Sequence, residues 1–509
     1  MSKAVYLNPE SRTWTSARKS QAGTSAQVLS FHRTLPDYAE TSLRALPDLA
    51  ASLGLGHVLL KDESARFSLP AFKILGASWA VYRAVAARLG LVADHGAESG
   101  VSISIQDLGA RAKNAGIRLL TATEGNCGRA VARMAAYMGI PVRVYVPGFM
   151  AEATRAAIRG EGAEVVVLDG SYDELIPALW AEAESDGNAL LVLDVSFGNY
   201  ETIPSYFVEG YSTMLAESER QVLDATGGKP ATHAVVPCGA GSIAQAVTEH
   251  FKSAERTERL GGASVVAVEP TTAACLMASL RAGRPVTIDT GDTICCGMNC
   301  GTLSTTAWPV LQAGIDASAV VEDAESHRAV LELKDRDVLA GPCGAAALAA
   351  LKRVCADAKA DLGLDESSVV VLFCTEGPRD CRASFRSCLR ACRFPSALFS
   401  SVTFKFPPAL SLWYTLKLFR LFLDTKYGSW TFCAGRGDAT DGALCVKEEA
   451  EDGESVGAAG ASAGGVVSEG DVENVRFRMG RTNLIGVRMT EAVGAAAGRS
   501  ALQIMAAGF

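Results

Sequence analysis

The sequence predicts an α/β protein with open parallel sheets in two domains. Short apolar runs typical of buried strands, at residues 143–146 and 164–168, flank a helical stretch over 151–159. Such alternation is typical of βαβ units and a parallel sheet. The same alternation resumes after residue 233, which fits a second domain. At 509 residues the chain is also too long for one compact core, so two domains are expected.

The elements follow from apolar periodicity along the chain. Strands are expected over residues 57–63, 117–120, 143–146, 164–168, 234–237, 264–268 and 369–373. One helix is expected to begin at residues 41–43, and three others are expected over residues 77–87, 130–138 and 151–159. Residues 84–115 are interpreted as a helix-loop-helix with a polar insert at 94–100. Ligands of such sheets bind beyond the carboxyl ends of strands, so residues that follow strands are the functional candidates.

Composition and charge narrow the function classes. A net charge of −8 and the lack of a basic stripe argue against a nucleic-acid partner. Residues 1–26 lack the apolar core of a signal peptide. The 14 cysteines are scattered, which favours reduced thiols and a cytoplasmic location over a disulfide framework. Cys295, Cys296 and Cys300 lie close together but have no nearby His, so no metal site is expected.

Lys73 is the first candidate for chemistry. It lies between an apolar pair and a small-residue turn, directly before the helix expected at 77–87. Burial beside apolar neighbours lowers the pKa of a lysine and favours the neutral, nucleophilic amine. The helix N-terminus behind it would also attract an anion. The alternative is a salt-bridged surface lysine.

Three further segments place small and polar residues directly after predicted strands. Their sequences are Thr-Glu-Gly-Asn-Cys-Gly at 123–128, Cys-Gly-Ala-Gly-Ser at 238–242 and Cys-Thr-Glu-Gly at 374–377. The small residues at 238–242 would let backbone N–H groups converge on a phosphate, with the dipole of the following helix adding to the attraction. The alternative for such a loop is a simple tight turn.

The order of these motifs resembles that of fold-type II pyridoxal-phosphate (PLP) enzymes, and most closely the diaminopropionate ammonia-lyase family. The family's Phe-Lys-x-Leu-Gly, Gly-Asn-x-Gly and Thr-Glu-Gly signatures have counterparts at 72–76, 125–128 and 375–377. The segment from Asp194 to Tyr211 also matches. The resemblance covers about residues 25–390. It implies a PLP-dependent carbon–nitrogen lyase, acting as a homodimer, that converts 2,3-diaminopropionate to pyruvate and ammonia by α,β-elimination.

The resemblance also implies the cofactor contacts. Lys73 would be the covalent attachment point, and Asn126 would bond the 3-hydroxyl of the cofactor. Cys374, with Thr375 as the alternative, would give the ring nitrogen a neutral partner, which favours β-elimination over transamination. The phosphate would be held by Cys238, Gly239, Ala240, Gly241 and Ser242.

Two acids are the expected catalytic partners of Lys73. Asp194 matches the family's strand-end Asp and would take the α-proton of the L-isomer, with Lys73 as the alternative base. Glu124 occupies the position of a family Asp that acts on the D-isomer. Its longer side chain puts D-isomer activity in doubt, since a misplacement of about 1 Å can cost roughly 100-fold in rate. Cys127, in place of the family's His, and residues 302–305 also depart from the pattern.

The domain organisation follows from these assignments. Residues 1–40 form an N-terminal segment, and 41–392 form a catalytic region of two interleaved α/β domains, the smaller over about 85–210. Residues 393–509 change in character. Pro407, Pro408 and several cations make the apolar part unsuited to a membrane span, and the rest has the composition of disorder. We expect a disordered tail or translated non-coding sequence there.

Two other functions remain open at this point. The first is a serine/threonine dehydratase-like enzyme on the same fold, which would eliminate hydroxide instead of an amine. Carboxylates at positions 124 and 194 favour the diamine. The second is a non-catalytic PLP-binding paralogue, which the departures at Glu124, Cys127 and 302–305 would fit.

Overall fold

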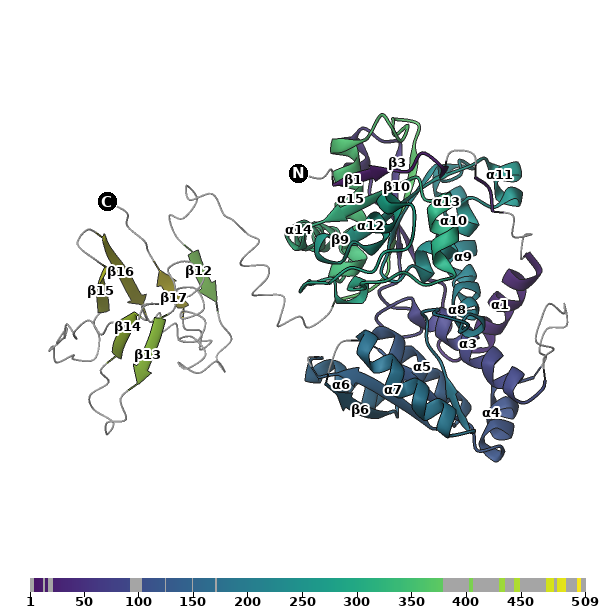
Figure 1. Ribbon diagram of the computed structural model, residues 1–509. Coiled ribbons are helices and arrows are strands. Elements are labelled where there is room, and N and C mark those ends of the chain that lie inside the picture. Colours follow the sequence, from purple (N-terminus) through teal and green to yellow (C-terminus); the bar gives the residue numbers. More distant parts are fainter. Residues whose placement is uncertain are drawn as a thin grey trace. The chain divides into compact units, whose positions relative to one another are not determined.

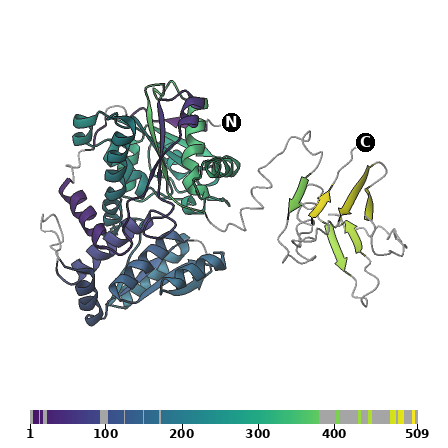
Figure 2. The ribbon, with the colours of Figure 1, turned by 180° about the vertical axis from the view of Figure 1, so that it is seen from behind.

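The computed structural model describes residues 4–11, 14–16, 22–91, 103–123, 125–148, 150–169 and 172–378, and several strands between residues 402 and 504. The chain divides into two units, Met1–Ala391 and Cys392–Phe509. The first unit contains two sheets, which Figure 1 and, from behind, Figure 2 show as separate layers of the same body. The α/β class expected from the sequence is confirmed.

The larger sheet has seven strands in the order β1-β10-β9-β8-β11-β3-β2. From β10 to β3 neighbouring strands are parallel, and β1 and β2 pair antiparallel at the two edges. The strands are β1 (Val5–Leu7), β2 (Leu43–Ala45), β3 (His57–Asp62), β8 (His233–Pro237), β9 (Ser264–Pro270), β10 (Ala317–Val321) and β11 (Val369–Cys374).

Helices cover both faces of this sheet, which is why its central strands β8 and β11 are buried along their whole length (Figure 1). One face packs under α2 (Pro47–Leu53), α14 (Asp323–Lys334) and α15 (Pro342–Asp357). The other face packs under α1 (Ala22–Thr34), α8 (Thr202–Gly210), α9 (Ser212–Thr226) and α10 (Ser242–Phe251). The remaining helices of this part are α11 (Ala254–Leu260), α12 (Cys275–Ala282) and α13 (Ala307–Gly314), with 3₁₀ turns η2 (Thr271–Ala273) and η3 (Cys296–Met298).

The smaller sheet is entirely parallel, in the order β6-β5-β4-β7. Its strands are β4 (Arg118–Ala122), β5 (Val142–Pro147), β6 (Glu164–Leu168) and β7 (Ala189–Leu191). Helix α7 (Tyr172–Ser185) packs on one face, and α5 (Asn126–Met138) and α6 (Glu152–Gly160) belong to the other. Helices α3 (Lys73–Arg88) and α4 (Ile105–Asn114) connect the two sheets. Because α3 contacts both α5 and α8, one apolar core runs from the larger sheet into the smaller one.

The predicted strands of both sheets are confirmed, with bounds shifted by one or two residues. The helix expected to begin at 41–43 is wrong. Leu43 instead opens β2, which pairs antiparallel with β3. The carbonyl oxygen of Thr41 accepts a hydrogen bond from Lys61 in β3, and its hydroxyl accepts one from Arg66 in the loop after β3. Helix α3 begins at Lys73 itself, four residues earlier than the pattern indicated. The polar insert at 94–100 lies outside the described residues.

In the second unit, four strands form an antiparallel sheet in the order β12-β17-β16-β15, and β13 pairs with β14. The strands are β12 (Val402–Lys405), β13 (Trp430–Ala434), β14 (Leu444–Glu448), β15 (Glu473–Met479), β16 (Asn483–Thr490) and β17 (Ala501–Ile504). Over the described part of the whole chain, no helix is both long and apolar enough to cross a membrane.

Candidate active site

The residues predicted from four separate segments lie where parallel strands end. Asn126 follows β4 and Asp194 follows β7, both in the smaller sheet. Cys238 follows β8 and Cys374 ends β11, both in the larger sheet. Lys73 opens α3, the helix that joins the two sheets. The carboxyl ends of the strands therefore carry the candidate site, as expected for an open parallel sheet.

Lys73 and Asp194 form an ion pair. Lys73 Nζ donates to Asp194 Oδ2 at 2.5 Å, with 20% and 12% of the two side chains exposed. Burial is the largest single effect and lowers the pKa of Lys73, but the charge and hydrogen bond of Asp194, with smaller contributions from Tyr211 and Cys127, together outweigh it, so the pKa is raised overall. The sequence-based expectation of a lowered lysine pKa is therefore wrong, because it considered burial without this partner.

Two titratable groups among the described residues around this pair, Cys127 and Tyr211, are neutral. Burial, followed by the nearby Asp194 carboxylate, raises the pKa of the Cys127 thiol well above its usual value. Burial also raises the pKa of the Tyr211 phenol. The phenol of Tyr200 receives a hydrogen bond from the Leu193 N–H at 3.0 Å, and so holds the backbone directly before Asp194. Charge at this point of the site is thus concentrated on the ion pair.

The glycine loop between β8 and α10 has the shape of an anion cradle. Gly241 adopts φ +105°, and α10 begins at the next residue, so the N–H groups of its first turn end in this loop. A Cβ added to Gly239 would lie 3.2 Å from Cys300 Sγ and 3.2 Å from the Gly297 carbonyl oxygen. A side chain at Gly239 would therefore have to displace its neighbours, which fits a loop in which the backbone rather than side chains would contact a ligand.

The end of β11 lies against the segment that precedes Lys73. The Phe72 N–H donates to the Thr375 carbonyl at 3.3 Å, and the Gly377 N–H donates to the Pro70 carbonyl at 2.9 Å. Cys374 is fully buried, and burial raises the pKa of its thiol well above the usual value, so the thiol stays neutral. Two motifs that are remote in the sequence are thus joined by backbone hydrogen bonds.

Asn126 contacts a residue that the sequence-based analysis did not assign. Its Nδ2 donates to Glu376 Oε2 at 2.9 Å, and Glu376 also accepts from the Cys343 N–H at 3.2 Å. Only 3% of Glu376 is exposed. The Thr-Glu-Gly motif pointed to this position, but nothing in the sequence showed which side chain it contacts.

A hydroxyl cluster ties the Asp194 loop to the glycine loop. Ser196 Oγ lies 3.1 Å from Ser304 Oγ and 2.9 Å from Thr306 Oγ1, and it accepts from the Thr306 N–H at 3.0 Å. The Ser304 N–H in turn donates to the Ala240 carbonyl at 2.8 Å. Residues 302–305 were noted from the sequence as a departure from the family pattern. Two of these residues, Ser304 and Thr305, contact Ser196 and so belong to this cluster.

Glu124 lies outside the described residues, so its role on the D-isomer stays a prediction. The backbone that follows Glu124 is held by Thr123, whose Oγ1 accepts from the Gly125 N–H at 2.9 Å and the Gly128 N–H at 3.0 Å.

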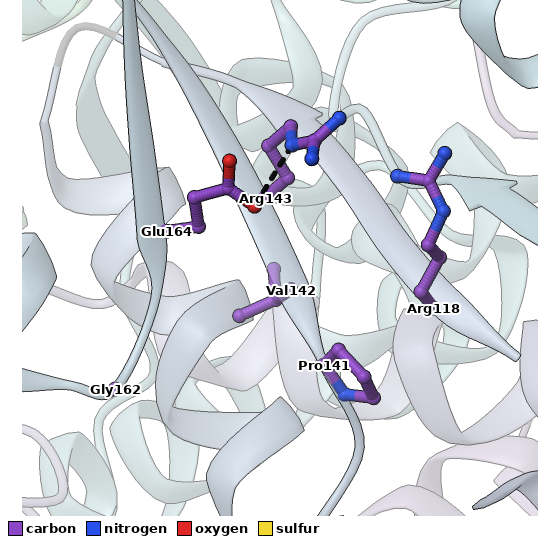
Figure 3. A pocket seen from close by; sticks show the side chains of 6 residues that line it. All are labelled: Arg118, Pro141, Val142, Arg143, Gly162 and Glu164. Atoms are coloured by element: carbon purple, nitrogen blue, oxygen red, sulfur yellow. Dashed lines mark hydrogen bonds and ion pairs between the residues drawn. The ribbon is translucent and has the colours of Figure 1, made fainter.

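A separate hollow of about 240 Å³ lies at the other end of the smaller sheet (Figure 3). Its charged lining residues are Arg118, Arg143 and Glu164, which occupy the amino ends of β4, β5 and β6. Arg143 pairs with Glu164 at 3.0 Å, and both arginines pair with Glu182. Because Asn126 and Asp194 lie at the carboxyl ends of β4 and β7 in the same parallel sheet, this hollow is not part of the candidate active site.

Comparisons with known proteins agree with this arrangement. A family model described as "Pyridoxal-phosphate dependent enzyme" matches residues 34–375. Diaminopropionate ammonia-lyase of Salmonella typhimurium is 32% identical over 366 residues, which cover 69% of this chain and 88% of that protein. The crystal structure of diaminopropionate ammonia lyase from Escherichia coli, in complex with an aminoacrylate-PLP azomethine reaction intermediate, is similar with a TM-score of 0.66 and 26% identity. That match covers 76% of this chain and 97% of the other. The biosynthetic L-threonine dehydratase of Corynebacterium glutamicum is 28% identical over 275 residues, or 53% of this chain and 57% of that protein.

Proposed function

Because the chain belongs to the pyridoxal-phosphate dependent enzymes and, within them, to the diaminopropionate ammonia-lyase family, we propose that it converts 2,3-diaminopropionate to pyruvate and ammonia by α,β-elimination. The observation that carries this proposal is the Lys73–Asp194 pair, which places a lysine and a carboxylate together where the ends of both sheets converge. The diamine carries two ammonium groups, and a largely buried carboxylate is a suitable partner for one of them.

The residues present fit PLP. In the loop Cys238–Ser242, close neighbours leave little space for a side chain at Gly239. The loop ends at the N-terminus of α10, whose free N–H groups could bind a phosphate. Cys374 is a neutral thiol, which suits a pyridine nitrogen that stays unprotonated. Lys73 would hold the cofactor covalently, and Asn126 would bond its 3-hydroxyl. When bound, PLP supplies an electron sink for the pair left at Cα after proton loss.

The side chains of this protein would transfer the α-proton and bind the substrate. Lys73 Nζ, or Asp194 as the alternative base, would accept the α-proton of the L-isomer, and Glu124 would accept that of the D-isomer. In the free protein the Asp194 carboxylate keeps Lys73 protonated, since the pKa of this lysine is raised. The same carboxylate would then attract the β-ammonium group of the substrate. Closely placed acid and base groups of this kind contribute about 10²–10⁴-fold to rate.

A second candidate function is serine/threonine dehydration. It is favoured by the 28% identity to an L-threonine dehydratase over 275 residues. A neutral hydroxyl leaving group needs no carboxylate partner, so the position of Asp194 favours the diamine.

Compartment, assembly and domain limits are part of the same proposal. The described cysteines form no disulfide, which supports a cytoplasmic location. The family resemblance supports a homodimer. The smaller sheet, which runs from β4 to β7, supports a smaller domain over about 85–210 inside a catalytic region at 41–392.

Pyruvate release by the purified protein with PLP tests the function. L- and D-diaminopropionate are supplied separately, with L-serine and L-threonine for comparison. Faster turnover of the diamine is the expected result, and the ratio of D- to L-isomer rates reports on Glu124. Activity confined to serine or threonine would assign the chain to dehydration. Binding of PLP with no turnover of any substrate would assign it to the non-catalytic paralogues.

A further inference from the structure

We propose that Glu376 is a positioning residue that fixes the side-chain amide of Asn126 and so sets the affinity of the site for PLP. The inference rests on the proposed function, because it takes Asn126 as a cofactor contact. Glu376 has no role among the residues assigned above, although it is a buried carboxylate within the site.

The two carboxylate oxygens of Glu376 face donors from different parts of the fold. Oε2 accepts from Asn126 Nδ2 at 2.9 Å, at the start of α5 beside the smaller sheet. Oε1 accepts from the Cys343 N–H at 3.2 Å, in the first turn of α15 on the larger sheet. Both oxygens thus act as acceptors, one of them for an N–H group in the first turn of α15. The carboxylate therefore joins the two sheets at the site.

The surrounding backbone holds Glu376 in this position. The Gly341 N–H donates to the Glu376 carbonyl at 2.9 Å. A Cβ added to Gly341 would lie 2.9 Å from Glu376 Oε1 and 2.3 Å from the Gly377 carbonyl oxygen, so only glycine fits there. On its other side the backbone of Glu376 bridges Ala71, two residues before Lys73. The carboxylate thus has a fixed place relative to the lysine.

The consequence for Asn126 is chemical. An asparagine amide can present either its oxygen or its NH₂ group to a neighbour, and the choice depends on what that neighbour accepts or donates. Both oxygens of the Glu376 carboxylate accept hydrogen bonds, so Glu376 requires the NH₂ group of Asn126 on its side. One N–H then bonds Glu376, and the second N–H of the same group is held in a single direction for the 3-oxygen of the cofactor.

Replacing Glu376 by Gln tests this directly. A glutamine has one acceptor atom where the carboxylate has two, so it can satisfy Asn126 Nδ2 or the Cys343 N–H but not both. Glu269→Gln is the matched control. Glu269 is also fully buried and accepts backbone N–H groups at a helix start, from Leu276 at 2.6 Å and Met277 at 2.9 Å, but it does not contact Asn126.

The measurements are the dissociation constant of PLP, by absorbance titration of the apoprotein, and urea unfolding of the same apoprotein. Both variants are expected to unfold at lower urea concentration. Only Glu376→Gln is expected to bind PLP more weakly, by roughly 10-fold, whereas Glu269→Gln stays within about 2-fold of the wild type. In an Asn126→Ala background the effect of Glu376→Gln on PLP affinity should disappear, as expected for a residue that acts through another.

Equal PLP affinity in the two glutamine variants would overturn the inference. So would an undiminished effect of Glu376→Gln in the Asn126→Ala background. If the wild-type protein itself does not bind PLP, the proposed function fails and the inference fails with it.

Discussion

Two lysines in neighbouring parts of the chain, Lys61 and Lys73, are both paired with carboxylates but in different ways. Lys61 is fully buried, and its ammonium donates to the Thr41 carbonyl at 2.8 Å, to Glu217 at 2.9 Å and to Gln221 at 3.0 Å. Lys73 keeps 20% of its side chain exposed, and in the described part of the chain its ammonium donates to Asp194. One lysine has all its donors satisfied, whereas the other has donors left for a ligand.

The charges around the two lysines differ in the same sense. Beside Lys61, Arg66 pairs with both Glu63 and Glu217 at 2.6 Å, so the buried cluster is a closed network. The pKa of Lys61 is lowered overall, because burial outweighs the effect of these carboxylates. The pKa of Lys73 is raised overall, although burial lowers it, and Asp194 is the main cause of the rise. We infer that the closed network holds the fold and that the open pair performs chemistry.

Lys73→Ala is expected to have the largest effect on activity. Pyruvate release from diaminopropionate should fall by about 10³–10⁴-fold, because the variant loses both the cofactor attachment and a base. The free energy of unfolding should fall by less than it does for the fully buried Lys61, since 20% of the Lys73 side chain and 12% of the Asp194 side chain are exposed. A variant that keeps more than a tenth of wild-type turnover would show that Lys73 is not the functional lysine.

Lys61→Met is expected to show the opposite pattern. Removing one member of a buried ion network costs about 3–5 kcal/mol of unfolding free energy, which urea unfolding measures. Turnover per folded molecule should stay near that of the wild type. If this variant were as stable as the wild type, the closed network would not be what holds this part of the fold.

Asp194→Asn should lower diamine turnover by about 10²-fold, because the partner of the second ammonium group is lost. Turnover of serine should fall by a smaller factor. The pKa of Lys73 should fall, since burial acts on it without opposition. Only the neutral amine reacts, so the rate at which the apoprotein takes up PLP should rise at a lower pH than in the wild type.

The matched control for this variant is Asp316→Asn. Asp316 pairs with Lys252 at 2.8 Å, and about a tenth of each side chain is exposed, but the pair lies at the start of β10, away from the site. This control should leave the pH dependence of PLP uptake unchanged. A shift of equal size in both variants would contradict the role given to Asp194.

Ser196→Ala should reduce kcat/KM by roughly 10-fold, because the hydroxyl cluster that holds the Asp194 loop against residues 304–306 loses its centre. Ser218→Ala removes an equally buried hydroxyl, bonded to the Met214 carbonyl at 2.7 Å within α9, and should leave kcat/KM near that of the wild type. Similar kcat/KM values for the two variants would mean that the cluster does not position Asp194.

His32 gives the smallest expected effect, through pH. It is fully buried between Thr213, at 2.7 Å, and the Leu75 carbonyl, at 3.0 Å, and burial lowers its pKa to about 3. The unfolded chain, with a histidine pKa of about 6.5, binds more protons between these two values, so stability falls as pH falls through this window. The slope is at most about 1.4 kcal/mol per pH unit.

Urea unfolding between about pH 7 and about pH 5 measures this slope, and His32→Gln should remove the part that comes from His32. An identical pH dependence in the variant and the wild type would show that His32 does not titrate in this way.

Much of this architecture could be predicted from the sequence, because strand ends and glycine loops leave local patterns. Patterns of this kind predict that Asn126, Cys238 and Cys374 lie at or beyond strand ends and that Lys73 lies close to the start of a helix, and the structure has them there. The resemblance suggested Asp194 as a catalytic partner, but the ion pair that raises the pKa of Lys73 leaves no local signal, since the two residues lie 121 positions apart in the chain. For the same reason the bond from Asn126 to Glu376 and the cluster around Ser196 carry no local signal.

The most direct test of the difference between the two lysines is to find where the cofactor is attached. The PLP-loaded protein is reduced with sodium borohydride, digested, and analysed by mass spectrometry for the peptide that carries the cofactor. We expect the modification on the peptide that contains Lys73, with the peptide of Lys61 unmodified. Attachment at any other lysine, or no attachment at all, would contradict the account.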